Sequence, residues 1–485
     1  MTLDQSNPPD EAPPPNAPTL SHTGWRLAFP FALGILAVWL LGSLTTVPRE
    51  VALMTGIFVL AALLWVTEAL PLFATSLLVI GLQVVLLANP GGWTGLGFAT
   101  GDAPSYRDIL GAAADPVLVL FFGGLVLARA VVKTGLDRVM CGLLLRPFGS
   151  KPHWVLLGLM LITLLFSMWM SNTATTAMML ALSAPVVATL PPKDPFRKAL
   201  ALGVPFAANI GGVSTPIASP PNAVALGFLE KAGHEVAFLD WMVVAVPLML
   251  GLALFTWFVL CKSFPPETSA LRLEQTRERP TRPGWIVLGV LVVTVLLWLT
   301  GRWHGVPSAV VALLPVVALG AAGVFTRNDL GRIEWSILIL IAGGISLGAG
   351  MQMTGLDQLA VQWLPTSGKN NLWLLAALVA ATMILGSFMS NTAAANLLLP
   401  VGLAAAAAAG PEGGLHPVHV ALSIALAASL AMPLPISTPP NAIAFARGEF
   451  ATRDMARIAL IIAVPAALLI ITGGGWVLRF WGLLQ

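Results

Sequence analysis

The sequence predicts an all-α polytopic membrane protein. Of its 485 residues, 57% are hydrophobic and 10% are charged, whereas soluble domains carry about 25% charged residues. From residue 25 onward, apolar stretches long enough to cross a hydrocarbon core of about 30 Å follow one another with short polar interruptions. The alternating pattern of a membrane β-barrel is absent, so these stretches must satisfy their backbone hydrogen bonds as helices.

Eleven apolar segments predict transmembrane helices. They occupy residues 25–44, 51–69, 70–90, 114–130, 200–229, 236–261, 284–300, 308–325, 335–356, 416–446 and 458–480. Residues 1–24 are rich in proline and acid and lack the basic and apolar regions of a secretory signal, so they predict a disordered cytoplasmic tail. A cytoplasmic linker at 263–283 divides the remaining chain into a first half, 25–262, and a second half, 284–485.

Two further apolar stretches, 153–190 and 371–409, are each divided by the triplet Ser-Asn-Thr into two arms. An arm of about 17 residues, at about 1.5 Å per residue, rises roughly 26 Å, which is slightly less than the hydrocarbon core. Each stretch therefore predicts a re-entrant hairpin that enters and leaves on the same side of the membrane, with the triplet at its tip.

The distribution of basic residues predicts the orientation, because cytoplasmic loops collect Lys and Arg. With the N-terminus inside, 19 of the 25 Lys and Arg residues fall in cytoplasmic segments and 6 in outer segments. The C-terminus is then outside, and we expect a multi-pass protein of the cell inner membrane.

Several blocks of the sequence occur twice in the same order. The triplet Ser171–Thr173 returns as Ser390–Thr392, and Pro220–Asn222 returns as Pro439–Asn441, both 219 residues later. The earlier stretch FFGGLVLARAVVKTGLD matches IAGGISLGAGMQMTGLD 220 residues later. An odd number of predicted helices separates the two hairpins, so the second copy enters from the opposite face. Inverted repeats with interrupted helices at matching places are typical of secondary transporters whose site lies near the bilayer midplane.

Prolines interrupt the predicted helices 200–229 and 416–446 at matching places. Because proline has no N–H and pushes the preceding residue out of the α region, each helix must unwind inside the membrane. The candidate caps of the new half-helices are Thr173, Thr392, Asn222 and Asn441. The N-termini of these half-helices offer N–H groups and positive dipole ends to an anion. The carbonyl oxygens that end the preceding half-helices suit a small cation such as sodium.

Each signal has a simpler alternative. Ser, Asn and Thr often join neighbouring membrane helices by hydrogen bonds, and a Pro-Pro pair is often only a kink. The equal spacing of 50 residues from Asn172 to Asn222 and from Asn391 to Asn441 favours a paired site over both alternatives. For Glu68, near the end of a span, a functional acid and a structural hydrogen bond both stay open.

Other classes of protein are disfavoured. The six histidines lie in the tail, in loops or at segment ends, and the sequence contains no HExxH or GxSxG, so we expect no enzyme. Cys141 and Cys261 form no spaced framework, so we expect neither a disulfide nor a cofactor beyond sodium as a coupling ion. The net charge of +3 is too small and scattered for a nucleic-acid binder. A channel would not need a paired inverted site.

Five stretches together resemble the divalent anion:sodium symporter family, the sodium-coupled carriers of dicarboxylates, citrate and sulfate. They are SMWMSNTATTAMML, SFMSNTAAANLLLP, WVTEALPL, IGGVSTPIASPPNAVA and ISTPPNAIAF. The resemblance covers nearly the whole chain after residue 25. It implies eleven transmembrane helices plus two re-entrant hairpins, a homodimer with a scaffold domain at the interface, and an elevator-like movement of a transport domain.

Carried over by position, the resemblance also implies site residues. The implied substrate contacts are Asn172, Thr173, Thr215, Pro216, Asn391, Thr392 and Pro435. The implied sodium sites are Ser167, Ser171, Asn172 and Ser214 for one, and Gly386, Met389, Asn391 and Pro433 for the other. Two positions depart from the repeat: Leu434 stands opposite Thr215, and Gly386 stands opposite Ser167. The second sodium site then relies on backbone oxygen, uses Ser387, or is weak.

The predicted function is sodium-driven uptake of a C4-dicarboxylate such as succinate, malate or fumarate. The central spans contain no Lys or Arg, so a dianion at the midplane needs bound cations as well as helix dipoles. A dicarboxylate exchanger without sodium coupling and a sodium/sulfate symporter stay open as alternatives. The expected partners are a small di- or tricarboxylate or sulfate anion, Na⁺, the lipid bilayer and a second copy of the chain.

Overall fold

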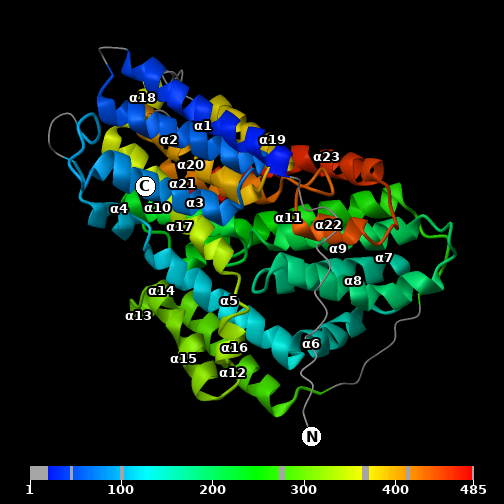
Figure 1. Cartoon of the computed structure of the whole chain (residues 1–485). Helices are drawn as coiled ribbons and strands as arrows, with labels where there is room; N and C mark the ends of the chain where they lie inside the picture. The colour runs from blue at the N-terminus through cyan, green and yellow to red at the C-terminus, as the bar shows by residue number, and fades with distance from the viewer. Residues whose placement is uncertain are drawn as a thin grey trace, which may run out of the picture.

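The computed structural model describes residues 20–43, 47–98, 103–271, 279–362, 371–410 and 415–482. Every regular element in these ranges is a helix, which confirms the all-α class (Figure 1). The first half contains α1 (Leu20–Gly42), α2 (Arg49–Thr67), α3 (Leu72–Gln83) with a π-helical turn at Val84–Ala88, α4 (Tyr106–Ala112), α5 (Pro116–Thr134), α6 (Leu136–Leu145) with a 3₁₀ turn at Arg146–Phe148, α7 (Pro152–Ser167), α8 (Asn172–Thr189), α9 (Phe196–Gly211), α10 (Pro220–Lys231) and α11 (Phe238–Ser263).

The second half is also helical throughout the described ranges. It contains α12 (Arg282–Leu299), α13 (Gly301–His304), α14 (Ser308–Val311), α15 (Leu313–Ala321), α16 (Arg327–Leu330), α17 (Trp335–Thr354), α18 (Leu356–Gln362), α19 (Leu372–Phe388), α20 (Asn391–Ala409), α21 (Pro417–Ser429), α22 (Pro439–Phe445), α23 (Thr452–Leu468) with a π-helical turn at Leu469–Gly473, and α24 (Gly474–Phe480).

Among the described residues, seven helices are long and apolar enough to cross a membrane. Six further apolar helices are shorter, and they include α7, α19 and α21. The chain therefore has several membrane-crossing helices by length and composition, while the number of eleven spans stays a prediction.

Two predicted segments, the tail 1–24 and the linker 263–283, adjoin helices of the structure. Helix α1 begins at Leu20, inside the predicted tail 1–24. The last proline of the tail is Pro18, and residues 1–19 lie outside the described residues. The predicted linker 263–283 is bounded by the end of α11 and the start of α12, and its residues 272–278 also lie outside the described part.

The repeated motif Thr-Gly-Leu-Asp ends a long helix and begins a short one in each repeat. Gly135 follows α5 with φ +66°, and Gly355 follows α17 with φ +76°. Glycine adopts this left-handed conformation without a steric penalty, so it ends a helix and turns the chain. The short helices α6 and α18 begin at the next residue, and the sequence analysis did not predict them.

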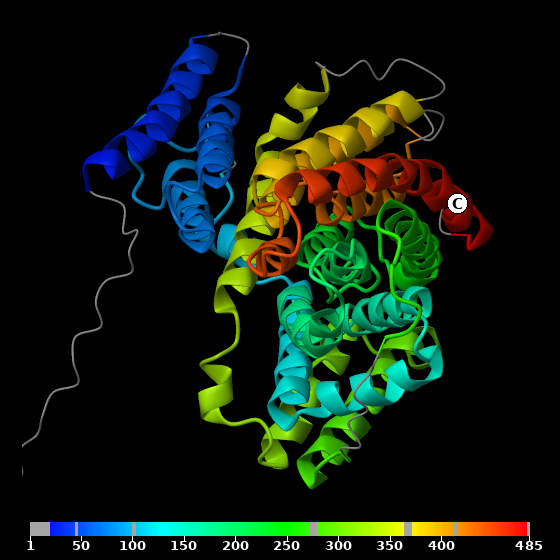
Figure 2. The ribbon, with the colours of Figure 1, turned by 90° about the vertical axis from the view of Figure 1, so that its right-hand side faces the viewer.

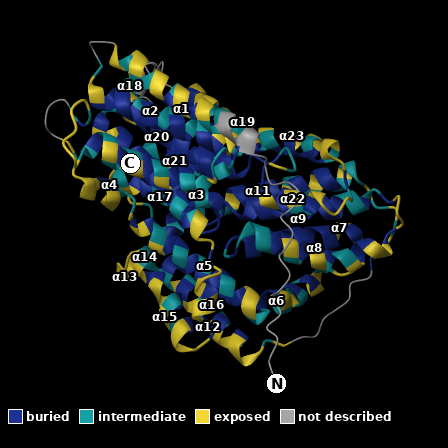
Figure 3. Cartoon of the chain, in the orientation of Figure 1, coloured by how far each residue is buried: buried dark blue, intermediate teal, exposed yellow. Residues whose placement is uncertain are grey.

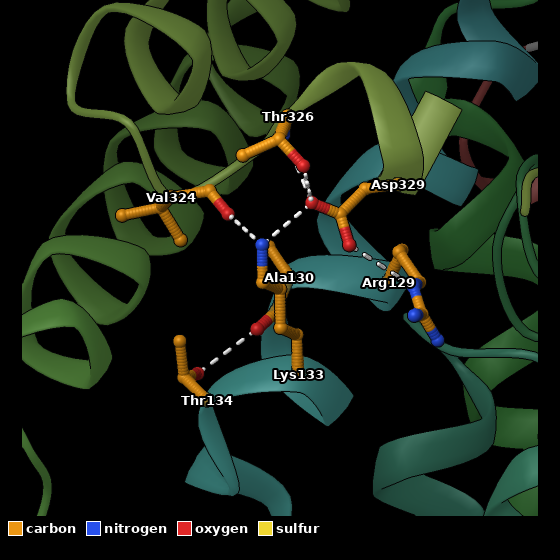
Figure 4. Close-up of polar contacts among 7 residues, drawn as sticks. All are labelled: Arg129, Ala130, Lys133, Thr134, Val324, Thr326 and Asp329. Carbon is orange, nitrogen blue, oxygen red and sulfur yellow. Dashed lines mark hydrogen bonds and ion pairs between the residues drawn. The ribbon is translucent and has the colours of Figure 1, made fainter. Parts of the chain in front are cut away.

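A cluster of charged and polar groups fixes α5 just before Gly135 (Figure 4). Lys133 donates to the carbonyl of Val324 at 2.8 Å and to the Asp329 carboxylate at 2.6 Å. Thr326 donates to the same carboxylate from its backbone N–H at 2.9 Å and from its hydroxyl at 2.7 Å. Burial favours the neutral form of Asp329, but the Lys133 ammonium and the Thr326 donors outweigh it and hold its pKa well below the ordinary value.

The two repeats form equivalent groups of helices. The first hairpin, α7–α8, packs against the broken helix α9–α10 at α9, and the second hairpin, α19–α20, packs against the broken helix α21–α22 at α21. Across the repeats, α10 packs on α20 and α21, while α22 packs on α8 and α9. The start of each broken helix thus lies beside the end of the other, which is the arrangement expected of two copies that run in opposite directions.

These groups form the buried middle of the molecule. Residues of α9, α20 and α21 are mostly buried, whereas α1 and α12 are largely exposed (Figure 3). Helices α1 and α2 pack on one another at one edge (Figure 2), where α2 and α17 also contact α3. On the other side of the repeats, α12, α14 and α15 pack against α5.

Candidate functional site

The two triplets form nearly identical turns between the hairpin arms. Ser171 and Ser390 take the N-cap positions, with φ −56° and ψ 127° in one and φ −56° and ψ 132° in the other. The helices begin at Asn172 and Asn391, so the prediction that Thr173 and Thr392 are caps is wrong by two residues. The backbone of each serine is already non-helical and its carbonyl accepts the first helical bond, so each threonine falls in the first turn.

The broken helices unwind at the predicted prolines. A first loop, residues 212–219, separates α9 from α10, and a second loop, residues 430–438, separates α21 from α22. Ser219 and Thr438 occupy the N-cap positions of the new helices, with φ −144° and −143°. The Ser219 hydroxyl is paired with Ser429 rather than with a backbone N–H of α10. In the second repeat the Thr438 hydroxyl accepts from the N–H of Asn441 at 3.3 Å.

The two asparagines after the Pro-Pro pairs hold the loops rather than cap the helices, so their predicted capping role is also wrong. Asn222 donates its carboxamide N–H groups to the carbonyls of Gly212 at 3.1 Å and Thr215 at 2.8 Å. In the second repeat, Asn441 donates to Met432 and to Leu434, both at 3.1 Å. Each side chain thus satisfies carbonyls that the unwound helix leaves without N–H partners.

In the first repeat, the hairpin tip touches the loop directly. The Asn172 carboxamide lies so close to Gly212 that a Cβ at residue 212 would be 2.1 Å from its Nδ2 atom. The Thr215 hydroxyl donates to the carbonyl of Met168 at the end of α7, at 2.6 Å. The structure therefore brings together the predicted residues of α7, the triplet and the loop.

The second repeat makes related contacts with different residues. A Cβ at Gly386 would lie 3.4 Å from the Asn391 Oδ1 atom and from the carbonyl of Ala428. The Ser437 hydroxyl donates to the carbonyl of Ser387 at 2.9 Å. The Ser387 hydroxyl itself donates to Met383 within α19 at 2.6 Å, so its proton points back into its own helix.

Four of the predicted cation ligands are buried oxygens without a hydrogen-bond partner in the described part of the chain. In the first repeat these atoms are Ser167 Oγ, Asn172 Oδ1 and Ser214 Oγ, and in the second repeat only Asn391 Oδ1. A buried oxygen without a partner costs about 1–3 kcal/mol, and hydroxyl and amide oxygens are ligands that hard cations prefer. The residues present in the first repeat therefore fit a small cation. In the second repeat Gly386 and Pro433 replace both hydroxyls.

The repeats contact each other through polar residues that the sequence analysis did not identify. Asn209 of α9 donates to the Thr438 hydroxyl and to the Asn441 carboxamide oxygen, both at 3.1 Å. The hydroxyls of Ser219 and Ser429 are 3.0 Å apart. Asn209 and Ser429 are polar residues in the last turns of apolar half-helices, a signal that could have indicated them.

The two loops differ in accessibility. Residues 212–219 are buried, including Pro216, whereas Pro433, Leu434 and Pro435 are half-buried and Ile436 is 78% exposed. Asn172, Thr173 and Asn391 are half-buried at the tips, while Thr392 is buried. The second loop is therefore the more accessible of the two.

Helix ends supply the charge complementarity of this region. None of the predicted substrate or sodium ligands has an ionisable side chain. The N-termini of α8 and α20 point their first N–H groups out of the tips, and helix N-termini favour anions. Glu68 is exposed and ends α2 in the left-handed conformation, with φ 48°.

Comparison with known proteins identifies the family. The family model described as "Citrate transporter" matches residues 62–413 and also residues 295–483. The chain belongs to the citrate transporter family. Members of this family are transporters and not enzymes, so the protein is a multi-pass membrane transporter, as its sequence predicts. The resemblance to the divalent anion:sodium symporters is confirmed.

Several relatives in the citrate transporter family are similar over most of the chain. An uncharacterized transporter of Haemophilus influenzae is 32% identical over 93% of this chain and 96% of its own length. The sodium-dependent high-affinity dicarboxylate transporter 3 of Caenorhabditis elegans is 30% identical over 84% and 80% of the two chains. Two fungal relatives are longer: the chain covers 48% of an uncharacterized transporter of Schizosaccharomyces pombe and 37% of the inorganic phosphate transporter PHO87 of Saccharomyces cerevisiae.

A solved structure shows the same fold. The YdaH transporter of Alcanivorax borkumensis, whose crystal structure is described as having an unusual topology, matches with a TM-score of 0.55. The match covers 89% of this chain and all of that chain at 16% sequence identity, so the likeness concerns the fold alone.

Proposed function

We propose that the protein is a sodium-coupled symporter that takes up C4-dicarboxylates such as succinate, malate or fumarate. The observation that carries this proposal is that three buried oxygens, at Ser167, Asn172 and Ser214, have no hydrogen-bond partner in the described part of the chain. A bound Na⁺ would satisfy all three, and its charge would lie beside the N-terminus of α8, where an anion is favoured. Cation and anion then neutralise each other, and none of the proposed site residues is basic.

Each predicted site residue has a role in this proposal. Asn172, Thr173, Asn391 and Thr392 contact the carboxylates from the two tips, and Thr215, Pro216 and Pro435 border them from the loops. Ser167, Ser171, Asn172 and Ser214 hold one sodium ion, and Gly386, Met389, Asn391 and Pro433 hold a second. The sites are unequal, because among the described residues the second offers one side-chain oxygen without a partner where the first offers three.

The proposed arrangement in the membrane follows the repeats. Eleven transmembrane helices and two re-entrant hairpins, α7–α8 and α19–α20, form two inverted halves, 25–262 and 284–485. The N-terminus is cytoplasmic, the C-terminus is outside, and the protein resides in the cell inner membrane as a homodimer. The hairpins and broken helices form a transport domain that moves against a scaffold domain like an elevator. Helix α22 packs on α8, and α10 packs on α20, so each broken helix contacts the hairpin of the other repeat. These contacts support one rigid transport domain.

Purified protein in liposomes tests the function. We expect saturable counterflow of labelled succinate in the presence of sodium and its loss when choline replaces sodium. Transport that is unchanged in choline would refute sodium coupling and favour a dicarboxylate exchanger. Flux that stays linear in succinate concentration would refute a carrier.

A small oxyanion such as sulfate is the second candidate substrate. Leu434 removes the hydroxyl that the first repeat has at Thr215, which leaves fewer donors for a second carboxylate, and one relative is named as an inorganic phosphate transporter. Unlabelled sulfate or phosphate that competes with succinate at equal concentration would favour this candidate.

A further inference from the structure

Two equivalent carbonyl groups lie at the ends of the first hairpin arms. Met168 and Ser387 are 219 residues apart, and each precedes the asparagine of its triplet by four residues. The Met168 carbonyl accepts the Thr215 hydroxyl at 2.6 Å, and the Ser387 carbonyl accepts the Ser437 hydroxyl at 2.9 Å. Both repeats therefore join the hairpin tip to their own loop by the same kind of hydrogen bond.

The two hydroxyls do not come from equivalent positions. Leu434 occupies the repeat position of Thr215, and Ala218 occupies that of Ser437. The second repeat has lost the hydroxyl at one position and makes the contact from a residue three positions later. The contact, rather than the residue that makes it, is common to both repeats.

Ser437 also determines the shape of the second loop. Its backbone N–H donates to the Leu434 carbonyl at 3.1 Å, and its hydroxyl accepts from the Leu434 N–H at 3.2 Å. The hydroxyl thus joins a closed turn to the end of α19. Ser437 is buried, but the adjacent Ile436 is 78% exposed. Packing therefore does less to hold this loop than it does in the buried first loop, and the hydrogen bonds of Ser437 matter correspondingly more.

We propose that Ser437 is a positioning residue of the second half-site: its hydroxyl holds the second loop against the hairpin tip that carries Asn391. The inference rests on the proposed function, because this half-site is the one assigned to the second sodium ion and to one end of the anion. Loss of the hydroxyl removes the partner of two backbone groups, the buried Ser387 carbonyl and the half-buried Leu434 N–H. The half-site then loses its preformed geometry, while the chain keeps its fold.

The test moves the hydroxyl to the position that the first repeat uses. We expect S437A to raise the KM for succinate and the half-saturating sodium concentration about tenfold, with kcat changed less than about twofold, as loss of a buried hydrogen bond at a binding site predicts. The double variant L434T/S437A places a threonine hydroxyl where Thr215 has one, and we expect it to restore most of the affinity. The matched control is S423A, which removes a buried hydroxyl of α21 that has no partner in the described part of the chain.

Hydrogen exchange provides a reading that needs no substrate. We expect backbone exchange in residues 385–392 to become about tenfold faster in S437A and to return toward wild type in the double variant. Hydrogen exchange in S437A that equals that of the wild type overturns the proposal. A double variant that restores neither the slow exchange, nor the affinity, nor the folded protein also overturns it. Wild-type protein that shows no sodium-driven succinate uptake overturns the proposed function instead, and the exchange experiment still decides the role of Ser437.

Discussion

The contact between Gly212 and Asn172 predicts that one added methyl group disables the proposed first sodium site. Gly212 has φ −61° and ψ −15°, an ordinary helical conformation that alanine also adopts, so G212A strains no backbone. The new Cβ would lie 2.1 Å from Asn172 Nδ2 and 2.8 Å from its Oδ1. Ordinary contacts of a Cβ begin at 3.4 Å, so the carboxamide must turn away.

The magnitude follows from what Asn172 then loses. Displacing one oxygen that binds a charged group costs about 1.5–3 kcal/mol, which corresponds to a factor of roughly 10–150 in the half-saturating sodium concentration. N172A removes the same oxygen, so we expect a loss of similar size. Once Asn172 is truncated, the methyl group at residue 212 has nothing to displace, and the double variant G212A/N172A should resemble N172A alone.

Sodium-dependent uptake in liposomes and sodium-dependent thermal stabilisation in detergent both measure this effect. The control is G251A in α11, because a Cβ at Gly251 meets nothing within 4 Å. Wild-type sodium dependence in G212A would refute the assignment of Asn172 to the sodium site. Losses that multiply in the double variant would show that Gly212 acts by another route.

The remaining predictions concern three other groups of contacts. S214A should raise the half-saturating sodium concentration about tenfold, and unchanged sodium titrations would remove Ser214 from the site. D329N should lower the free energy of unfolding by roughly 1–3 kcal/mol. D454N breaks a more exposed ion pair and should lower it by less than about 1 kcal/mol. Equal shifts of the thermal midpoint in the two variants would contradict this. Because the pKa of Asp329 is depressed, its contribution is complete above about pH 4 and is lost as the pH falls further, so the D329N effect should shrink in acid. N222A should lower the thermal midpoint more than a surface Asn→Ala change, since two buried carbonyls of the first loop lose their donors.

Features that depend on local chemistry were predictable from the sequence. Apolar segments indicate helices because backbone groups in lipid need internal partners, and the described part of the chain is helical. The breaks at Pro220 and Pro439 follow from the missing N–H of proline, and both new helices begin at these residues. The internal repeat also predicted which segments correspond, and the packing of α9 with α22 and α10 with α21 agrees with opposite directions.

The partners of the polar side chains were not predictable. Asn222 and Asn441 are good caps by residue type. In the structure their carboxamide N–H groups donate instead to carbonyls that the unwound loops leave free. Ser219 and Thr438 occupy the N-cap positions instead, and of these two Thr438 accepts a backbone N–H with its side chain. The residue type determines which kinds of group a side chain can bind. The path of the backbone determines which of those groups lies within its reach.

The sequence by itself determined the helical class, the two copies, the places where the helices break and the membership of a transporter family. Only the tertiary structure decided that Ser437 makes the contact of Thr215 and that Asn209 joins the two repeats. It also decided that three oxygens of the proposed first half-site lack partners among the residues that the structure describes. The physical reason is distance along the chain. Helix breaks depend on a few neighbouring residues, whereas Asn209 and Thr438 are 229 residues apart and meet only because the whole fold brings the two broken helices together.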